Sequence, residues 1–428
     1  MKRFTLYTIT ILVALGLSLS AAAGNGDRFL DVIVKLDVDT AAMPGQQGRD
    51  MAAAVAGEYG VQARHTYGTV FSGFSARVPQ AVFNQMKNDP LIATIDIDAP
   101  VYIAGGNCPH CGGGGGDDGG SNQTVPWGIE RVGAPTSNTG AGIAVYVIDT
   151  GIDPNHRDLN VVGGFASEGC KGRCAASWDD DHGHGTHVAG TTGALDNDVD
   201  VVGVAPGVDL YAVKVLSNSG SGSRSGVIAG IDWVAEQAII KGEAVVANMS
   251  LGGSGSKSGS CTNSGFTGTD TYHEAICNAR NVGVVFVVAA GNSGADADGA
   301  VPAAYDDTVI TVSATNSNDD WTSWSNWGDR SANWTSNDSA PVAIAAPGAS
   351  ILSTSAGGGT ETMSGTSMSS PHVAGGAALV LSSSNQPNDG RAFENVRSAL
   401  LNGAESTNNF SNTSGNPHDE DFLDVRGL

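Results

Sequence analysis

The chain has 428 residues, 40% of them hydrophobic, which is enough for a sizeable buried core and for more than one average domain. Its 60 glycines and its 15% content of charged residues indicate a compact, turn-rich protein and argue against a charged disordered one. The formal net charge of −23 repels polyanions, so we expect no nucleic-acid partner and no binding to an anionic membrane surface.

The N-terminus has the residue order of a secretory signal peptide. Lys2 and Arg3 precede an apolar run at 6–19, and the small residues Ala21 to Ala23 follow it. This order predicts export and cleavage after Ala23, so that residues 1–23 are removed. The apolar run is too short to span a bilayer comfortably, and we expect a secreted, extracellular protein that leaves the membrane once the signal is cleaved.

The six cysteines are expected to be oxidised in an exported chain. Their spacing favours three local disulfides, although other connectivities stay open: Cys108–Cys111, Cys170–Cys174 and Cys261–Cys277. The segment 108–111 also has the spacing of a redox dithiol. Such motifs normally open a helix after a strand, whereas this one lies among glycines, so a structural role is favoured.

The residues that follow the signal, 24–103, are expected to form a small α+β unit. Strands are predicted at 31–36, 70–78 and 92–97, and helices at 50–59 and 81–87. The next segment, 104–122, is a glycine-rich linker whose composition is flexible and accessible to proteases.

From residue 123 to residue 428, short apolar strands alternate with helical stretches. Strands are predicted at 144–148, 210–216, 244–249, 284–289 and 309–312, and helices at 184–193, 225–241 and 273–281. The alternation predicts an α/β fold, with a mostly parallel central sheet and helices on both faces. In such a fold, the residues that perform chemistry gather at the carboxyl ends of the strands.

Three motifs occur near predicted strand ends or helix starts. The strand 144–149 ends on Asp149, the segment 182–190 contains His184, and the segment 365–375 contains Ser367. Taken singly, they could be a turn aspartate, a metal-ligating histidine and a helix-capping serine. The histidines of the second motif lack the i, i+4 spacing of a zinc-binding pair, which disfavours a metal.

The three motifs together predict a more specific chemistry. A serine hydroxyl becomes a good nucleophile only when a base removes its proton, and imidazole is suited to that task near neutral pH. The imidazole in turn needs a carboxylate that sets its tautomer and stabilises its charged form. Asp149, His184 and Ser367 supply one group of each kind, and their order along the chain is that of subtilisin.

With these motifs, residues 123–428 resemble the subtilisin-like serine proteases, the subtilases, and are nearest the proteinase K branch. The stretches 213–216, 220–222 and 248–253 are also similar to the family. The resemblance implies a monomeric serine endopeptidase of broad specificity that hydrolyses polypeptides through an acyl-enzyme. Residues 24–103 resemble the family's propeptide, which implies an autoprocessed zymogen inhibited by its own propeptide.

Two alternatives to this interpretation are disfavoured. A kexin-type processing protease would need acidic pockets for paired basic residues and a further β-domain, for which the chain leaves no room after 421–425. A catalytically dead relative would lack a catalytic residue, whereas all four positions are filled, since Asn292 matches the family's oxyanion-binding asparagine.

The resemblance also implies where the substrate binds. Two backbone edges would accept an extended peptide as a strand between them, namely Gly220, Ser221, Gly222 and Ser250, Leu251, Gly252. The primary specificity pocket would be formed by Ala289, Ala290 and Gly291, with Ala300 near its base. None of these residues is charged, which predicts apolar or aromatic residues before the cut. Arg224 replaces the aromatic lid that the family usually has beside the more distant pocket.

A structural calcium ion is the one cofactor that the resemblance implies. The oxygen-rich loop 195–201 follows the helix predicted at 184–193. The implied ligands are the side chains of Gln123, Asp158 and Asn197 and the carbonyls of Leu195, Val199 and Val201. Six oxygens suit a hard cation such as calcium. Without the resemblance, the loop would be interpreted as an acidic surface loop.

Overall fold

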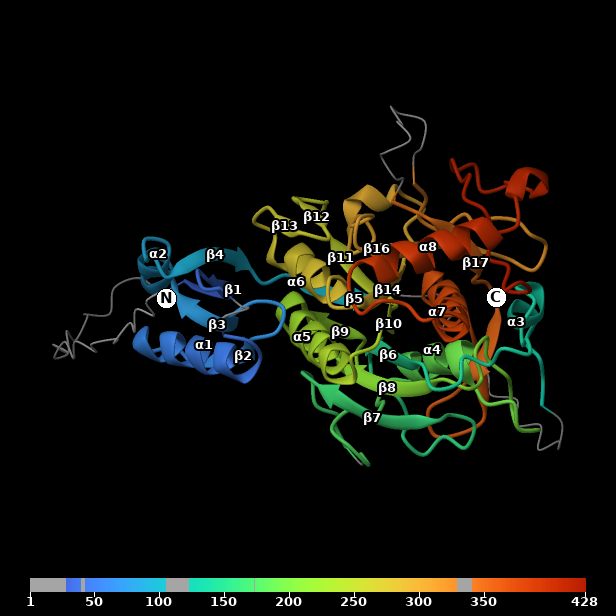
Figure 1. Ribbon diagram of the computed structural model, residues 1–428, viewed down its shortest axis with the longest axis horizontal. Helices are drawn as coiled ribbons and strands as arrows, with labels where there is room; N and C mark the ends of the chain where they lie inside the picture. Colours follow the sequence, from blue (N-terminus) through green and yellow to red (C-terminus); the bar gives the residue numbers. More distant parts are fainter. Residues whose placement is uncertain (1–27, 40–42, 105–122, 173, 329–340) are drawn as a thin grey trace, which may run out of the picture.

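A computed structural model describes residues 28–39, 43–104, 123–172, 174–328 and 341–428. The predicted signal peptide, nearly all of the predicted linker, and Cys108 and Cys111 lie outside the described residues. A small N-terminal unit lies against one side of a much larger unit, next to the helices α5 (Arg224–Lys241) and α6 (Thr271–Arg280) (Figure 1).

The N-terminal unit is a four-stranded antiparallel sheet, in the order β2-β3-β1-β4, with two helices. Its elements are β1 (Phe29–Leu36), α1 (Gln46–Glu58), β2 (Ala63–Tyr67), β3 (Gly73–Pro79), α2 (Gln80–Met86) and β4 (Ile92–Ile97). Alternate residues of β1, such as Val32 and Val34, pack with α1 in a core of their own. The predicted elements are confirmed, but β2 was missed because its middle residues are polar.

The larger unit is built on a seven-stranded sheet whose strands are all parallel, in the order β17-β16-β14-β10-β6-β8-β7. The strands are β6 (Ala144–Asp149), β7 (Val161–Ala166), β8 (Asp209–Lys214), β10 (Val245–Met249), β14 (Val284–Ala289), β16 (Val309–Thr315) and β17 (Ile344–Pro347). The predicted α/β fold is confirmed. Of these strands, β7 and β17 were not predicted, because they are short and contain few large apolar residues.

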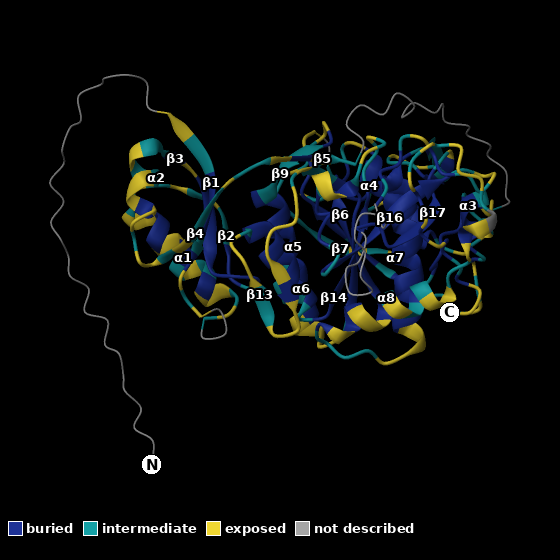
Figure 2. Cartoon of the chain, turned by 90° about the horizontal axis from the view of Figure 1, so that it is seen from above, coloured by how far each residue is buried: buried dark blue, intermediate teal, exposed yellow. Residues whose placement is uncertain are grey.

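Helices cover both faces of this sheet. The helices α4 (His184–Gly193) and α7 (Thr366–Ser383) pack with Val145 and Val147 of β6 on one face. On the other face, α5 and α6 pack with Tyr146 and Ile148. Alternate side chains of β6 therefore belong to two separate hydrophobic cores. Figure 2 shows the sheet and α7 as the most buried part of the chain.

Further elements complete the larger unit. They are α3 (Trp127–Arg131), β12 (Ser260–Thr262), β13 (Gly265–Thr267), β18 (Ile351–Thr354), β19 (Thr360–Met363), α8 (Arg391–Gly403) and 3₁₀ turns at 297–299 and 407–409. A further sheet, in the order β15-β11-β5-β9, joins the two units. It consists of β5 (Pro100–Ile103), β9 (Ser221–Ser223), β11 (Leu251–Ser254) and β15 (Ala300–Val301).

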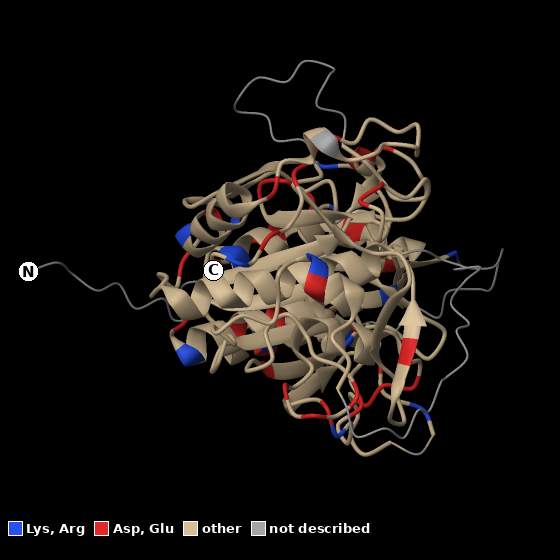
Figure 3. Cartoon of the chain, turned by 90° about the vertical axis from the view of Figure 1, so that its right-hand side faces the viewer, with Lys and Arg blue, Asp and Glu red and all other residues tan. Residues whose placement is uncertain are grey.

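Two of the predicted disulfides are present, Cys170–Cys174 and Cys261–Cys277. Among the described residues, no helix has the length and the apolar character needed to cross a membrane. Acidic and basic residues are spread over several loops, helices and strands on the side of the molecule drawn in Figure 3.

Candidate active site

Asp149 and His184 meet at the carboxyl edge of the sheet. Asp149 ends β6, and His184 begins α4 after Gly183, whose φ of 106° suits a residue without a Cβ atom. Both side chains are buried, and His184 Nδ1 lies 2.8 Å from Asp149 Oδ1. The Thr150 backbone N–H also donates to Asp149 Oδ1, at 2.7 Å. The carboxylate is thus held against the imidazole.

The environment raises the pKa of His184 above its ordinary value. Burial is the largest influence and acts to lower this pKa, but the charge and the hydrogen bond of Asp149 outweigh it, with help from Asp180 and Glu361. A neutral imidazole accepts a proton, so His184 can act as a base only above its raised pKa.

Ser367 is the second residue of α7, the helix that packs beside α4. Its hydroxyl oxygen lies 3.2 Å from the carbonyl oxygen of Ala104 and 3.2 Å from that of Ser250. Within the described residues, Ser367 forms no hydrogen bond with His184. The Ser367 hydroxyl donates to these two carbonyl oxygens instead.

Asn292, which follows β14, points its side-chain amide at the same carbonyl. Its Nδ2 donates to the Ala104 oxygen at 2.6 Å, while its Oδ1 accepts from the backbone N–H and the hydroxyl of Thr366. These two bonds orient the amide so that its donor faces Ala104. In the described part of the chain, the two donors to this oxygen are Asn292 Nδ2 and the Ser367 hydroxyl; the backbone N–H of Ser367 is not one of them.

The chain itself occupies the place predicted for an extended peptide. The strand β5 pairs antiparallel with β9 on one side and with β11 on the other. Ile103 donates its backbone N–H to the carbonyl of Gly220, and Ala104 donates to that of Ser250, each at 3.0 Å. Tyr102 lies opposite Ser221 and Gly252 in the two ladders. The six predicted edge residues are therefore brought together around one strand.

A cavity of about 350 Å³ lies where the primary pocket was predicted. It is lined by Ala289, Ala290, Gly291 and Ala300, together with residues that include Ala104, Asn292, Asn326 and Asp296. The half-buried Asp296 was missed by the sequence analysis. It follows Asn292 by four residues in a loop, and only the folded chain turns it toward the cavity.

Arg224, the residue that replaces an aromatic lid, begins α5. Its guanidinium donates to the carbonyl of Ser254 at 2.8 Å, and its charge lies 5.9 Å from the centre of the Tyr272 ring. Arg224 therefore links the start of α5, which directly follows β9, with the end of β11.

The N-terminal unit presents acidic groups to the starts of the two helices it covers. Asp98 accepts the backbone N–H of Ser225 at the start of α5, and Asp96 accepts that of Thr271 at the start of α6. These carboxylates satisfy helix N–H groups that have no partner within the helix. In the opposite direction, Asp232 of α5 accepts backbone N–H groups from the turn 68–70 and pairs with Arg49.

The residues predicted to bind calcium converge as expected. The carbonyl oxygens of Leu195, Val199 and Val201 lie 2.5, 3.4 and 3.0 Å from the side-chain nitrogen of Gln123. A half-turn of this amide about its Cγ–Cδ bond brings its oxygen to the same point, where it can serve as a ligand.

One buried acid fits a cation at this position. Asp158 is fully buried; its Oδ2 accepts the backbone N–H of Val201, and its Oδ1 has no hydrogen-bond partner among the described residues. Burial raises the pKa of Asp158 to about 7. The Asn197 side chain, whose Oδ1 accepts the backbone N–H of Val199, acts to lower the pKa of Asp158 and belongs to the same group. Carbonyl, amide and carboxylate oxygens are the donor set that calcium prefers.

Comparison with known proteins identifies the family. The model of the Subtilase family matches residues 140–419. Alkaline elastase YaB from Bacillus sp. (strain YaB) is 40% identical over 328 residues, which cover 76% of this chain and 72% of that protein. Subtilisin E from Bacillus subtilis (strain 168) is 34% identical over 386 residues, which cover 88% of this chain and 87% of that protein.

A solved structure agrees with these matches. The crystal structure of a cold adapted subtilisin-like serine proteinase aligns with a TM-score of 0.55 at 36% identity, over 70% of this chain and 98% of that chain. These comparisons do not single out the proteinase K branch, so that part of the resemblance stays a prediction. This chain belongs to the subtilase family and is a serine endopeptidase.

Proposed function

We propose that Asp149, His184, Ser367 and Asn292 carry out peptide hydrolysis. His184 takes the proton of the Ser367 hydroxyl, whose oxygen attacks the scissile carbonyl. Asp149 stabilises the imidazolium, and the Asn292 amide donates to the carbonyl oxygen as it becomes negative. His184 then protonates the leaving amine, and an acyl-enzyme is left. Water, activated by His184, releases the acyl group and restores the free serine.

The position of the Ala104 carbonyl supports this proposal. It lies beside the Ser367 hydroxyl and accepts from Asn292, as a scissile carbonyl must. We infer that the enzyme cleaves its own chain after Ala104, one residue beyond the propeptide end predicted from the sequence. The N-terminal unit is then the propeptide, and β5 remains in the cleft as a product would.

The contacts of the N-terminal unit support a second role for it, as an inhibitor. The strand β5 fills the place of a substrate, and the carboxylates of Asp96 and Asp98 bind at the starts of α6 and α5. Once the chain is cut, these contacts hold the propeptide without a covalent bond. The protease then stays inhibited until its propeptide dissociates or is digested.

We infer a preference for apolar residues immediately before the cut. Alanines form most of the predicted pocket wall, and Ala104 is the residue placed there in this chain. Asp296 lines the same cavity, and it is the group that would favour a basic residue instead. Peptides that differ only in Phe, Leu or Lys at this position separate the two outcomes.

The proposal includes a bound calcium ion and secretion. Gln123, Asp158, Asn197 and the three converging carbonyls would hold the ion and lock the loop 195–201 against the segment that starts at Gln123. Secretion rests on the signal peptide predicted at 1–23. A monomeric enzyme is also part of the proposal, as the resemblance to the family implies.

The first experiment compares the secreted wild type with Ser367→Ala by intact mass and N-terminal sequencing. The wild type is expected to start after Ala104 or, with further trimming, within 105–123, whereas Ser367→Ala keeps its propeptide. Ser264→Ala, in an exposed turn, is the matched control and is expected to mature normally. If Ser367→Ala is cut like the wild type, another protease performs the processing. If neither protein cleaves a peptide, the proposed catalytic residues are wrong.

A further inference from the structure

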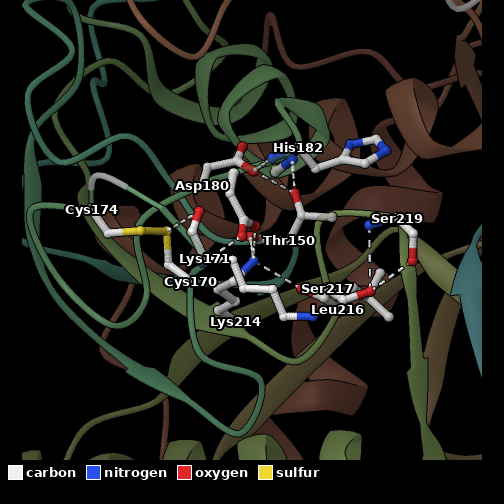
Figure 4. Close-up of polar contacts among 12 residues, drawn as sticks. Thr150, Cys170, Lys171, Cys174, Asp180, His182, Lys214, Leu216, Ser217 and Ser219 are labelled. Carbon is white, nitrogen blue, oxygen red and sulfur yellow. Dashed lines mark hydrogen bonds and ion pairs between the residues drawn. A yellow bond between two sulfur atoms is a disulfide. The ribbon is translucent and has the colours of Figure 1, made fainter.

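Lys214 is a completely buried lysine at the carboxyl end of β8. In the sheet, it lies directly opposite Asp149, the last residue of β6. Its ammonium group donates to the carbonyl of Thr150 at 2.6 Å, to Asp181 Oδ1 at 2.6 Å and to the carbonyl of Leu216 at 3.0 Å. An ammonium has three protons, and each of them has an acceptor here. Figure 4 shows Lys214 together with Thr150 and Leu216.

The three acceptors belong to three different parts of the active site. Thr150 follows Asp149, Asp181 lies three residues before His184, and Leu216 leads into the edge that binds β5. One buried cation therefore joins the segments that carry the proposed base, its carboxylate partner and the substrate-binding strand.

The contact with Thr150 acts on the position of Asp149. The peptide group on the other side of Thr150 donates its N–H to Asp149 Oδ1. The Thr150 hydroxyl donates to Asp180 and accepts the backbone N–H of Gly185 in the first turn of α4. Holding the Thr150 carbonyl therefore restrains both the carboxylate and the start of the helix that carries His184.

Asp181 is the counter-charge that makes a buried cation at Lys214 tolerable. Its second oxygen accepts the backbone N–H of Lys171, which lies within the loop closed by the Cys170–Cys174 disulfide. Although burial acts to raise the pKa of Asp181, its hydrogen bonds to Lys214 and Lys171 hold that pKa below its usual value. Asp181 thus stays charged and is held in place from two sides.

The contact with Leu216 acts on the substrate-binding edge. Beyond Leu216, the backbone N–H and the hydroxyl of Ser217 both donate to the carbonyl of Ser221, at 2.8 and 2.9 Å. Ser221 begins β9, the strand that pairs with β5. The position of the Leu216 carbonyl therefore influences the position of β9, the strand that aligns the peptide.

We propose that Lys214 is a positioning residue for peptide hydrolysis, which sets the relative placement of Asp149, His184 and the substrate-binding edge. The proposal rests on the catalytic roles proposed above for Asp149 and His184. Lys214 does not touch the reacting atoms, so its effect is on alignment. A displacement of about 1 Å in such a constellation can cost on the order of 10²-fold in rate.

The test compares Lys214→Met with a buried cation that is remote from the site. Met keeps most of the side-chain length and removes all three donors. The matched control is Arg280→Met, because Arg280 is 3% exposed and pairs with Glu394 at 3.0 Å. Arg280 ends α6 and precedes the amino end of β14, whereas the proposed catalytic residues lie at the carboxyl edge of the sheet.

Turnover is measured per active site, by titrating Ser367 with a serine-directed sulfonyl fluoride, and thermal unfolding is followed in parallel. We expect Lys214→Met to lower kcat/KM by about 10²-fold, with both a lower kcat and a higher KM. Arg280→Met is expected to lower Tm, while its KM and its kcat per active site stay unchanged. If Lys214→Met matches Arg280→Met in kcat and KM, Lys214 is only structural and the proposal is wrong.

Two further variants keep the test decisive if Lys214→Met does not fold. Asp181→Asn retains an oxygen for Lys214 and removes the charge, and Lys214→Arg retains the cation in a different shape. Each is expected to lower kcat/KM by less than Lys214→Met. Wild-type kinetics in Asp181→Asn would overturn the proposal. If the wild type cleaves peptides and Ser367→Ala cleaves them equally well, the proposed catalytic roles are wrong instead.

Discussion

Two groups of buried or partly buried acids in this protein obtain their hydrogen-bond and ion-pair partners from different units of the chain. At the carboxyl edge of the sheet, Asp149 is held by Thr150 and His184, and Asp181 by Lys171 and Lys214, all within the larger unit. On α5, by contrast, the nearly fully buried Asp232 is held by groups of the N-terminal unit.

This difference separates permanent contacts from removable ones. Burying a charged group is costly unless partners compensate it, so a charge whose partners leave must be able to return to water. Asp232 lies on the outer helix α5, where departure of the proposed propeptide would expose it. The acids at the sheet edge keep their partners, so the active site can remain organised after the propeptide has gone.

The largest effect is expected from removing a permanent charge, in Asp149→Asn. The substitution is expected to lower kcat by about 10⁴-fold, because the imidazole loses the group that sets its tautomer. Since Asp149 raises the pKa of His184, its loss lowers that pKa, and the acidic limb of the pH–kcat/KM profile moves to lower pH. Asp232→Asn, measured on the mature enzyme, is the control and should leave the profile in place.

A smaller loss is expected when only the oxyanion donor is removed. Asn292→Ala is expected to lower kcat by about 10²–10³-fold with little change in KM, because the bond strengthens as the carbonyl oxygen becomes negative. Asn278→Ala removes an amide that contacts the carbonyl of Val70 in the N-terminal unit, and serves as the control. A rise in KM alone for Asn292→Ala would mean that Asn292 binds substrate rather than the transition state.

Weakening the contact between the N-terminal unit and α5 is expected to shorten the inhibition by the propeptide and to leave turnover unchanged. Asp232→Ala leaves three N–H groups of the turn 68–70 without their acceptor and removes one of the two carboxylates that pair with Arg49. Bonds to charged groups are worth about 1.5–3 kcal/mol each. The lag between self-cleavage and full activity should shorten by about tenfold or more, with kcat unchanged. The lag is read from parallel gels and peptide assays. An unchanged lag would show that β5 alone retains the propeptide.

The proposed calcium site extends the comparison, because there the partner of a buried acid would be an ion and not a group of either unit. Removing calcium with a chelator is expected to lower Tm by about 5 °C, which corresponds to about 2.7 kcal/mol of binding at a hundredfold excess over Kd. In Asp158→Asn, the chelator should have little further effect. The control is Asp209→Asn, at the amino end of β8, whose Tm should respond to the chelator as that of the wild type does. A wild-type Tm that does not depend on calcium would exclude a structural ion at this loop.

The sequence by itself determined the α/β class, most of the strands and helices, and the residues now found around the Ala104 carbonyl. Strand and helix patterns are local, and the motifs around Asp149, His184 and Ser367 each lie within a few residues of one another, so a single sequence can carry them. The residues proposed to bind calcium were named from the resemblance to the family, and four of the six fall within the loop 195–201.

Only the tertiary structure decided how distant segments meet. It placed Ala104, one residue beyond the predicted propeptide end, beside Asn292, because the register of β5 depends on pairing with β9 and β11. It turned Asp296 toward the pocket, and it joined Thr150, Asp181 and Leu216 through Lys214. From the sequence, Lys214 is one more lysine in an apolar strand. Its role follows from burial and from three acceptors supplied by separate segments, and neither can be obtained from local sequence patterns.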